Sequence, residues 1–183
     1  AVCLYLWEVK RGILMETIFL NEKTLDKAAE LLKEGEIVAI PTETVYGLAA
    51  NALNESAVEK IYEAKGRPSD NPLIIHISKK DDVYLYVKEV SDKAKKLMDK
   101  FWPGPLTLIF KKKDIIPNRT SGGLDTVAVR MPENEIAKKI ISKCGFPLAA
   151  PSANISGKPS PTSFFHVIDD MNGKISAIVD GGD

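Results

Sequence analysis

The chain has few of the residues that several common enzyme classes need. Among its 183 residues are only two cysteines, Cys3 and Cys144, and two histidines, His76 and His166. Two cysteines are too few for a disulfide framework, and no histidine–cysteine cluster has the spacing of a zinc site. We therefore expect both cysteines to be reduced, as in an intracellular protein.

Common nucleotide-binding and nucleophile signatures are also missing. No G-x-G-x-x-G follows an expected strand, and neither G-x-x-x-x-G-K-[ST] nor G-x-S-x-G occurs. These absences argue against Rossmann and P-loop nucleotide sites and against the nucleophile turn of an α/β-hydrolase. A reaction in which bound substrates react with each other, without a protein nucleophile, remains compatible with the sequence.

Neither sign of charge predominates, since Lys+Arg and Asp+Glu number 25 each. The chain therefore has no overall basic field of the kind that attracts nucleic acid. The apolar run from Ala1 to Trp7 is too short for a membrane span and lacks the cations of a signal peptide. We expect residues 1–14 to be an extension or edge strand and residues 15–183 to form one catalytic domain. We also expect a cytoplasmic protein without a membrane partner.

Strand and helix patterns alternate along the chain, which predicts an α/β (α+β) domain. Apolar residues at helical spacing predict helices over residues 24–34, 56–64, 91–102 and 133–144, and a further helix beginning near Ser163. In the third of these, the expected inward stripe is Ala94, Leu97, Met98 and Phe101. Short apolar runs predict strands over residues 17–20, 36–40, 73–77, 106–110, 126–130, 148–150 and 175–179.

The most distinctive segment is 65–77, where Lys65 and Arg67 lie two residues apart at a Gly/Pro-rich turn. An apolar run that contains His76 follows the turn and is a predicted strand. Lysine offers a point charge and arginine a planar fork of donors, which together suit phosphate oxygens. From this segment alone, a solvated charged turn is an equally good interpretation.

Three further polar segments follow predicted strands. Residues 41–48 carry hydroxyls and a carboxylate, which suit a small polar ligand or a simple strand-to-helix turn. Arg130 ends an apolar strand and needs an anion, either a structural partner or a ligand carboxylate, and we favour the ligand. Residues 151–162 precede a helix, so their hydroxyls predict a phosphate site or a polar Ser/Pro loop.

Taken together, these segments resemble the YrdC-type threonylcarbamoyl-AMP synthases. The matching pieces are Pro41–Leu48, Lys65-Gly66-Arg67 with Asn71-Pro72-Leu73, Trp102–Thr107, Thr126–Pro132, and Ala150–Asn154 with Ser160-Pro161-Thr162. They extend from about residue 17 to the C-terminus, and their number and order make the resemblance specific. It implies a twisted mixed sheet, flanked by helices, around a positively charged cavity.

The resemblance also implies an activity and residue roles. L-threonine, bicarbonate and ATP with Mg²⁺ would give threonylcarbamoyl-AMP and pyrophosphate, for the threonylcarbamoyladenosine modification of tRNA completed by partner proteins. Lys65 and Arg67 would be catalytic. The implied ATP-binding residues are Lys65, Arg67, Asn71, Thr126, Ser152, Asn154 and Ser160. The implied L-threonine-binding residues are Thr44, His76, Arg130 and Ala150. The resemblance implies no metal ligand from the protein.

Two other functions remain open from the sequence. One is carbamoyl transfer from carbamoyl-AMP, as in the YrdC-like domain of hydrogenase maturation proteins. The other is a module that binds double-stranded RNA, as some relatives do, although the neutral net charge argues against it. Chains of the resembled family continue past Val179-Asp180-Gly181-Gly182 with a Ser-Thr-Val strand that contributes to the site. We therefore expect this sequence to lack the family's last segment.

Overall fold

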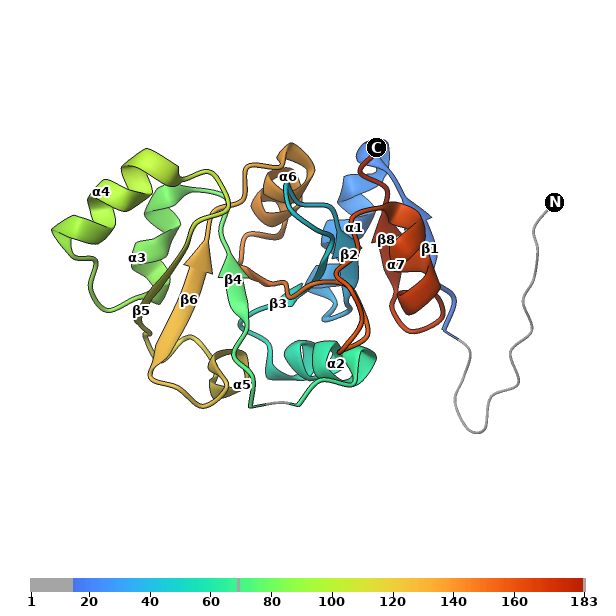
Figure 1. The fold of residues 1–183 in the computed structure, drawn as a ribbon, viewed down its shortest axis with the longest axis horizontal. Coiled ribbons are helices and arrows are strands. Elements are labelled where there is room, and N and C mark those ends of the chain that lie inside the picture. The colour runs from blue at the N-terminus through green and yellow to red at the C-terminus, as the bar shows by residue number, and fades with distance from the viewer. Residues whose placement is uncertain (1–14, 69, 183) are drawn as a thin grey trace.

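The computed structural model describes residues 15–68 and 70–182, so the expectation for residues 1–14 lies outside the described residues. One eight-stranded sheet runs through the molecule in the order β1-β8-β2-β3-β7-β4-β6-β5 (Figure 1). Its strands are β1 (Ile18–Leu20), β2 (Val38–Ile40), β3 (Gly47–Asn51), β4 (Ile74–His76), β5 (Thr107–Lys111), β6 (Thr126–Arg130), β7 (Leu148–Ala149) and β8 (Ala177–Val179).

Seven α-helices and two 3-10 helices occur within the described ranges. The α-helices are α1 (Leu25–Lys33), α2 (Glu55–Lys65), α3 (Val83–Tyr86), α4 (Asp92–Phe101), α5 (Asn118–Ser121), α6 (Glu135–Cys144) and α7 (Phe164–Met171). The 3-10 helices are η1 (Glu22–Thr24) and η2 (Lys80–Asp82). Ser91, Asn134 and Ser163 cap α4, α6 and α7 by accepting a backbone N–H three residues ahead, which explains where these helices begin.

The sheet is mixed, as predicted. β1 and β8, β2 and β8, and β4 and β6 pair in parallel. β2 and β3, β3 and β7, β4 and β7, and β5 and β6 pair antiparallel. Helices flank both faces, so the predicted mixed sheet with flanking helices is confirmed.

Two hydrophobic clusters cover the two faces of this sheet. The larger cluster joins α2, α3, α4 and α7 to one face, with Ile75, Val127 and Val129 among its strand residues. The smaller cluster joins α1 and α6 to the other face. Its strand residues come from β1, β8, β2, β3 and β7, and within the described ranges β4, β6 and β5 contribute none.

Among the described residues, this asymmetry leaves one part of the sheet without a covering helix layer. Side chains of residues paired in register on neighbouring strands point to the same face of the sheet, whereas successive side chains along one strand point to opposite faces. Since Ile75, Val127 and Val129 face the larger cluster, their strand neighbours face the other way. We call this surface the uncovered half-face; it carries Ile74 and His76 of β4, Thr126, Ala128 and Arg130 of β6, and Thr107, Ile109 and Lys111 of β5. Ile109 is 71% exposed, which fits the absence of a helix there.

Most predicted elements are confirmed, with residues 126–130 matching β6 at both ends. Strand β3 and the short helices α3 and α5 were not predicted. The interpretation of residues 41–48 as a strand-to-helix turn is wrong, because β3 begins at Gly47. The prediction that Phe101 faces the core is also wrong. Its side chain is 44% exposed at the last residue of α4, where Lys100 lies over its ring.

Candidate functional site

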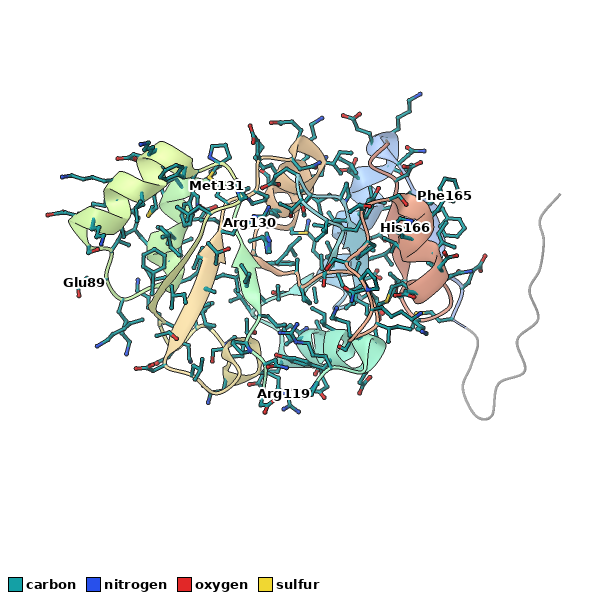
Figure 2. The ribbon with its side chains drawn as sticks, in the orientation of Figure 1. Glu89, Arg119, Arg130, Met131, Phe165 and His166 are labelled. Atoms are coloured by element: carbon teal, nitrogen blue, oxygen red, sulfur yellow. The ribbon has the colours of Figure 1, made fainter. Side chains whose placement is uncertain are left out.

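Most of the predicted site residues lie along strand β4, in two groups at its two ends, whereas Asn154 and Ser160 lie on the 151–162 loop. His76 is the last residue of β4 and is in register with Arg130 of β6. Ile74 is the first residue of β4, and its carbonyl accepts a hydrogen bond from the Ala150 N–H at 3.2 Å. Figure 2 shows Arg130 at the end of β6 that lies beside β4. The two groups therefore share one strand and one edge of the uncovered half-face.

The first group surrounds Pro72, just before β4 begins. Arg67 Nη2 donates to the Pro72 carbonyl at 3.3 Å. Extending the β4–β6 register by two residues brings Thr126 level with Pro72, and extending the β4–β7 register by three residues brings Ser152 level with it. The side chains of Asn71, Thr126 and Ser152 form no hydrogen bond with any residue that the structure describes. Their polar groups are therefore available to a ligand beside the Arg67 guanidinium.

Lys65 lies in the last turn of α2, and its side chain is buried rather than solvated. Its Nζ donates to the Ser152 carbonyl and to the Asn154 carbonyl, the latter at 2.8 Å. Burial, and after it the charge of Arg67, lower the pKa of Lys65 to about 8. The ammonium group thus remains mostly protonated at pH 7 and holds the start of the 151–162 loop beside Arg67.

Asn154 and Asp170 hold the rest of that loop. Asn154 Nδ2 donates to the Ile155 and Lys158 carbonyls at 2.9 and 2.8 Å. Both contacts lie within the loop, so the Asn154 side chain stabilises the conformation of the loop. Asp170 of α7 accepts from the Ile155 N–H at 3.1 Å and from Lys158 Nζ at 2.7 Å. The contribution of Asn154 to ATP binding stays a prediction.

Ser160 lies farther along the same loop. It lines a hollow of about 560 Å³ between residues 158–162 and helix α7. The structure therefore places Ser160 on the loop held by Lys65 and Asp170, where its hydroxyl forms no hydrogen bond with another described residue.

The second group surrounds Arg130. Its Nη2 donates to Glu43 Oε1 at 2.5 Å and lies 3.3 Å from Thr44 Oγ1. The two charged side chains are only 12% and 19% exposed. Burial alone raises the pKa of Glu43, but hydrogen bonds from Arg130 and from backbone N–H groups outweigh it and hold that pKa below its usual value. Arg130 thus has the anionic partner that its position requires, in the form of Glu43.

His76 lies next to Arg130 with only 4% of its surface exposed. Burial, and then the charge of Arg130, lower the pKa of His76 to about 4. The imidazole is therefore neutral at pH 7 and can accept a hydrogen bond through one ring nitrogen while donating through the other.

Buried polar atoms without a partner concentrate at these two groups. Within the described residues, the buried side-chain nitrogens that form no hydrogen bond are Arg67 Nε, His76 Nδ1 and Arg130 Nε. A buried polar atom left unpaired destabilises a fold, so these atoms make the two groups candidates for ligand binding. The sequence had singled out all three residues.

Sequence reasoning missed two residues that shape the site. Asp170 lies on α7, far from the motifs, and no sequence pattern indicates that it holds the 151–162 loop. The Tyr62 hydroxyl contacts the Asn71 and Arg119 carbonyls at 2.9 and 3.0 Å and so fixes the turn before β4. The helical pattern of α2 does not indicate this contact, because the bond to Asn71 depends on the path of the loop.

No group of three or more His, Cys, Asp or Glu side chains with metal-site geometry occurs among the described residues. Likewise, none of the helices in the described part of the chain is long and apolar enough to cross a membrane.

The fold is that of an α/β domain, and the two polar groups along β4 form a candidate site for small anionic and polar ligands. Comparison with known proteins agrees with this class. Residues 30–183 match the model of the Sua5, YciO and YrdC family, which is described as telomere recombination. The chain belongs to this family.

The curated relatives include two proteins named threonylcarbamoyl-AMP synthase. The one from Pyrococcus abyssi is 59% identical over 156 residues, which are 85% of this chain and 46% of the relative. The one from Bacillus subtilis is 56% identical over 163 residues, which are 88% of this chain and 47% of the relative. The chain thus spans about half the length of these relatives.

A solved structure gives the same picture. The crystal structure of P. abyssi Sua5 complexed with L-threonine matches with a TM-score of 0.88 and 55% sequence identity. The match covers 91% of this chain and 50% of that chain.

Proposed function

We propose that this domain makes threonylcarbamoyl-AMP from L-threonine, bicarbonate and ATP, for the threonylcarbamoyladenosine modification of tRNA. The observation that carries the proposal is the pair of polar groups along β4, with unpaired buried nitrogens at both ends. Four residues of extended chain separate Pro72 from His76, or about 13 Å. That span suits an amino acid at one end and the phosphates of a nucleotide at the other.

The amino-acid end binds L-threonine. The Arg130 guanidinium holds the threonine carboxylate, and Thr44 is a further contact. The Ala150 backbone, which is bonded to Ile74, contacts the threonine on the side toward the nucleotide. Glu43 fixes the Arg130 side chain through Nη2, which leaves Nε for the ligand. Neutral His76 hydrogen-bonds the threonine amino group. Once the threonine ammonium group has lost its proton, the free amine attacks bicarbonate. The new C–N bond forms, and the bicarbonate hydroxyl leaves as water with one amine proton, which gives the carbamate.

The nucleotide end binds ATP. The carbamate oxygen attacks the α-phosphorus, the bond to the β-phosphate oxygen breaks, and pyrophosphate leaves. Arg67 and Lys65 neutralise charge that grows on the phosphate oxygens, and Asn71, Thr126, Ser152 and Ser160 position the nucleotide. Preorganised donors of this kind contribute about 3–4 kcal/mol each to a transition state.

Magnesium fits this scheme as a partner of ATP. Mg²⁺ commonly binds through substrate phosphates and keeps several water ligands. When bound, it would supply further positive charge at the phosphates.

Threonine-dependent release of pyrophosphate tests the proposal. The chain, ATP, Mg²⁺ and bicarbonate should release pyrophosphate only when L-threonine is added. Release with carbamoyl phosphate in place of threonine would instead support the carbamoyl-transfer alternative. Salt-sensitive binding of double-stranded RNA without turnover would support the RNA-binding alternative.

We further propose that the product passes to the proteins that transfer the threonylcarbamoyl group to tRNA, and that the domain works in the cytoplasm. ATP and tRNA are both found there. The buried, unpaired Cys144 thiol also fits a reducing compartment.

A further inference from the structure

Three adjacent strands each place a polar residue at one level of the uncovered half-face. His76 of β4 is in register with Arg130 of β6, and Arg130 is in register with Thr107 of β5. These three residues form a row across the sheet, with Arg130 in the middle. The function proposed above uses only His76 and Arg130.

Thr107 points into the same space as the other two. Its neighbours Leu106 and Leu108 pack against the larger hydrophobic cluster on the opposite face. Side chains alternate along a strand, so the Thr107 side chain lies on the uncovered half-face. Directly opposite residues in an antiparallel pair have Cβ atoms about 4.5–5.5 Å apart, which puts Thr107 beside the stem of Arg130.

The hydroxyl of Thr107 is also available. It forms no hydrogen bond with another residue in the described part of the chain, and the residue is only partly exposed. Next to it, Arg130 Nε is buried without a partner. A hydroxyl and a guanidinium N–H on neighbouring strands can both donate to one carboxylate group.

The backbone around Thr107 is well fixed. Trp102 Nε1 donates to the Leu106 carbonyl at 2.7 Å, and the Gly104 N–H donates to the Met131 carbonyl at 2.8 Å. The first bond lies within the segment before Thr107 and fixes its shape, and the second ties that segment to the one after Arg130. The spacing between Thr107 and Arg130 is therefore held from both strands.

We propose that Thr107 is a further substrate-binding residue, whose hydroxyl donates to the amino-acid carboxylate held at Arg130. This rests on the proposed function, because it assumes that an amino acid binds there. With Thr107, the proposed site includes strand β5. The amino-acid end then consists of one residue from each of three adjacent strands: His76, Arg130 and Thr107.

Calorimetric titration of L-threonine and of ATP into matched variants tests this. Thr107→Val removes the hydroxyl at nearly constant shape, and the dissociation constant for L-threonine should rise about tenfold or more. The constant for ATP should stay within about twofold. Thr107→Ser keeps the hydroxyl and should bind L-threonine within about threefold of the wild-type chain. Ile109→Ala, two residues along the same strand and face, is the matched control and should change neither constant.

The outcomes separate the two proposals. If the wild-type chain binds no L-threonine and releases no pyrophosphate, the proposed function fails. If the wild-type chain binds and turns over but Thr107→Val binds L-threonine equally well, the role of Thr107 alone is overturned. A loss shared equally by L-threonine and ATP, or a Thr107→Ser variant as weak as Thr107→Val, would also overturn it. Thermal unfolding of each variant confirms that the compared chains are folded.

Discussion

At the scale of single residues, the site is marked by polar atoms that the fold leaves unsatisfied. Arg67 and Arg130 each bury an Nε without a partner in the described residues, while Nη2 of each is already bonded to the protein. Each of these side chains is held by a hydrogen bond from Nη2, and its Nε remains able to donate a hydrogen bond to a ligand. This arrangement distinguishes both residues from Arg119, whose Nε pairs with Glu59 at 2.5 Å on the surface.

We expect Arg67→Ala to weaken ATP binding by roughly a hundredfold, because a charge-assisted contact with phosphate is lost. Arg67→Lys should recover only part of the loss, since lysine lacks the planar fork. Arg119→Ala, which removes an exposed arginine of the neighbouring helix α5, is the control and should leave the ATP dissociation constant unchanged. An unchanged constant in Arg67→Ala would show that the phosphate assignment is wrong.

We expect Arg130→Met to raise the dissociation constant for L-threonine far more than that for ATP. The single variant leaves Glu43 partly buried without its counter-charge, which itself destabilises the fold. The double variant Arg130→Met/Glu43→Gln removes both charges and should recover stability without recovering threonine binding. Full threonine affinity in the double variant would mean that the Arg130–Glu43 pair is purely structural.

At the scale of elements, local patterns predicted most helices and strands, and the site residues within them. Residues 126–130 form a strand because Val127 and Val129 alternate with less buried neighbours. Strand β3 was missed because Gly-Leu-Ala-Ala-Asn has neither β-branched residues nor alternation, and it is a strand through its pairing with β2 and β7. Thr107 illustrates the same limit, since its place beside Arg130 depends on the register between two strands.

The turn between α5 and β6 offers a prediction about how the nucleotide end is held. Gly122 has a φ of +61°, and a Cβ there would lie 2.7 Å from the Asp70 carbonyl oxygen and 2.9 Å from Pro72 N. Gly122→Ala should therefore destabilise the fold by about 2–3 kcal/mol through strain and overlap. It should also weaken ATP binding, because the displaced segment carries Asn71.

Gly123→Ala is the matched control for this turn. Gly123 also has a positive φ, +81°, but a Cβ there would meet open space. Its cost should be about 1 kcal/mol, from backbone strain alone, with ATP binding retained. Denaturant unfolding and ATP titration of both variants check the prediction, and equal effects of the two changes would contradict it.

At the scale of the whole molecule, the two helix layers are of unequal width. The candidate site lies on the part of the sheet that only one helix layer of the described chain covers. Helical periodicity in the sequence predicted the helices that form the two layers. It did not predict how many strands each layer covers, because that number depends on the order of the strands in the sheet. The strands β4 and β6 are far apart in the sequence and adjacent in the sheet, which brings His76 to Arg130.

Burial of His76 makes stability depend on pH. Its pKa is about 4 in the fold and near 6.5 in an unfolded chain, so the unfolded state binds the proton first as pH falls. The stabilisation is complete above about pH 6.5 and is lost progressively toward pH 4, by roughly 3 kcal/mol. His76→Gln should flatten this part of the profile, whereas His166→Gln, at the exposed histidine of α7, should not. A profile unchanged by His76→Gln would show that other groups cause the pH dependence.

The central claim is that one domain joins an amino acid, bicarbonate and a nucleotide along strand β4. Mass spectrometry of a single turnover with ¹³C-labelled bicarbonate, L-threonine, ATP and Mg²⁺ tests it most directly. The account predicts an adenylate that contains threonine, AMP and one ¹³C atom, formed in step with pyrophosphate. Pyrophosphate release without threonine in the adenylate, or an adenylate without the labelled carbon, would contradict it.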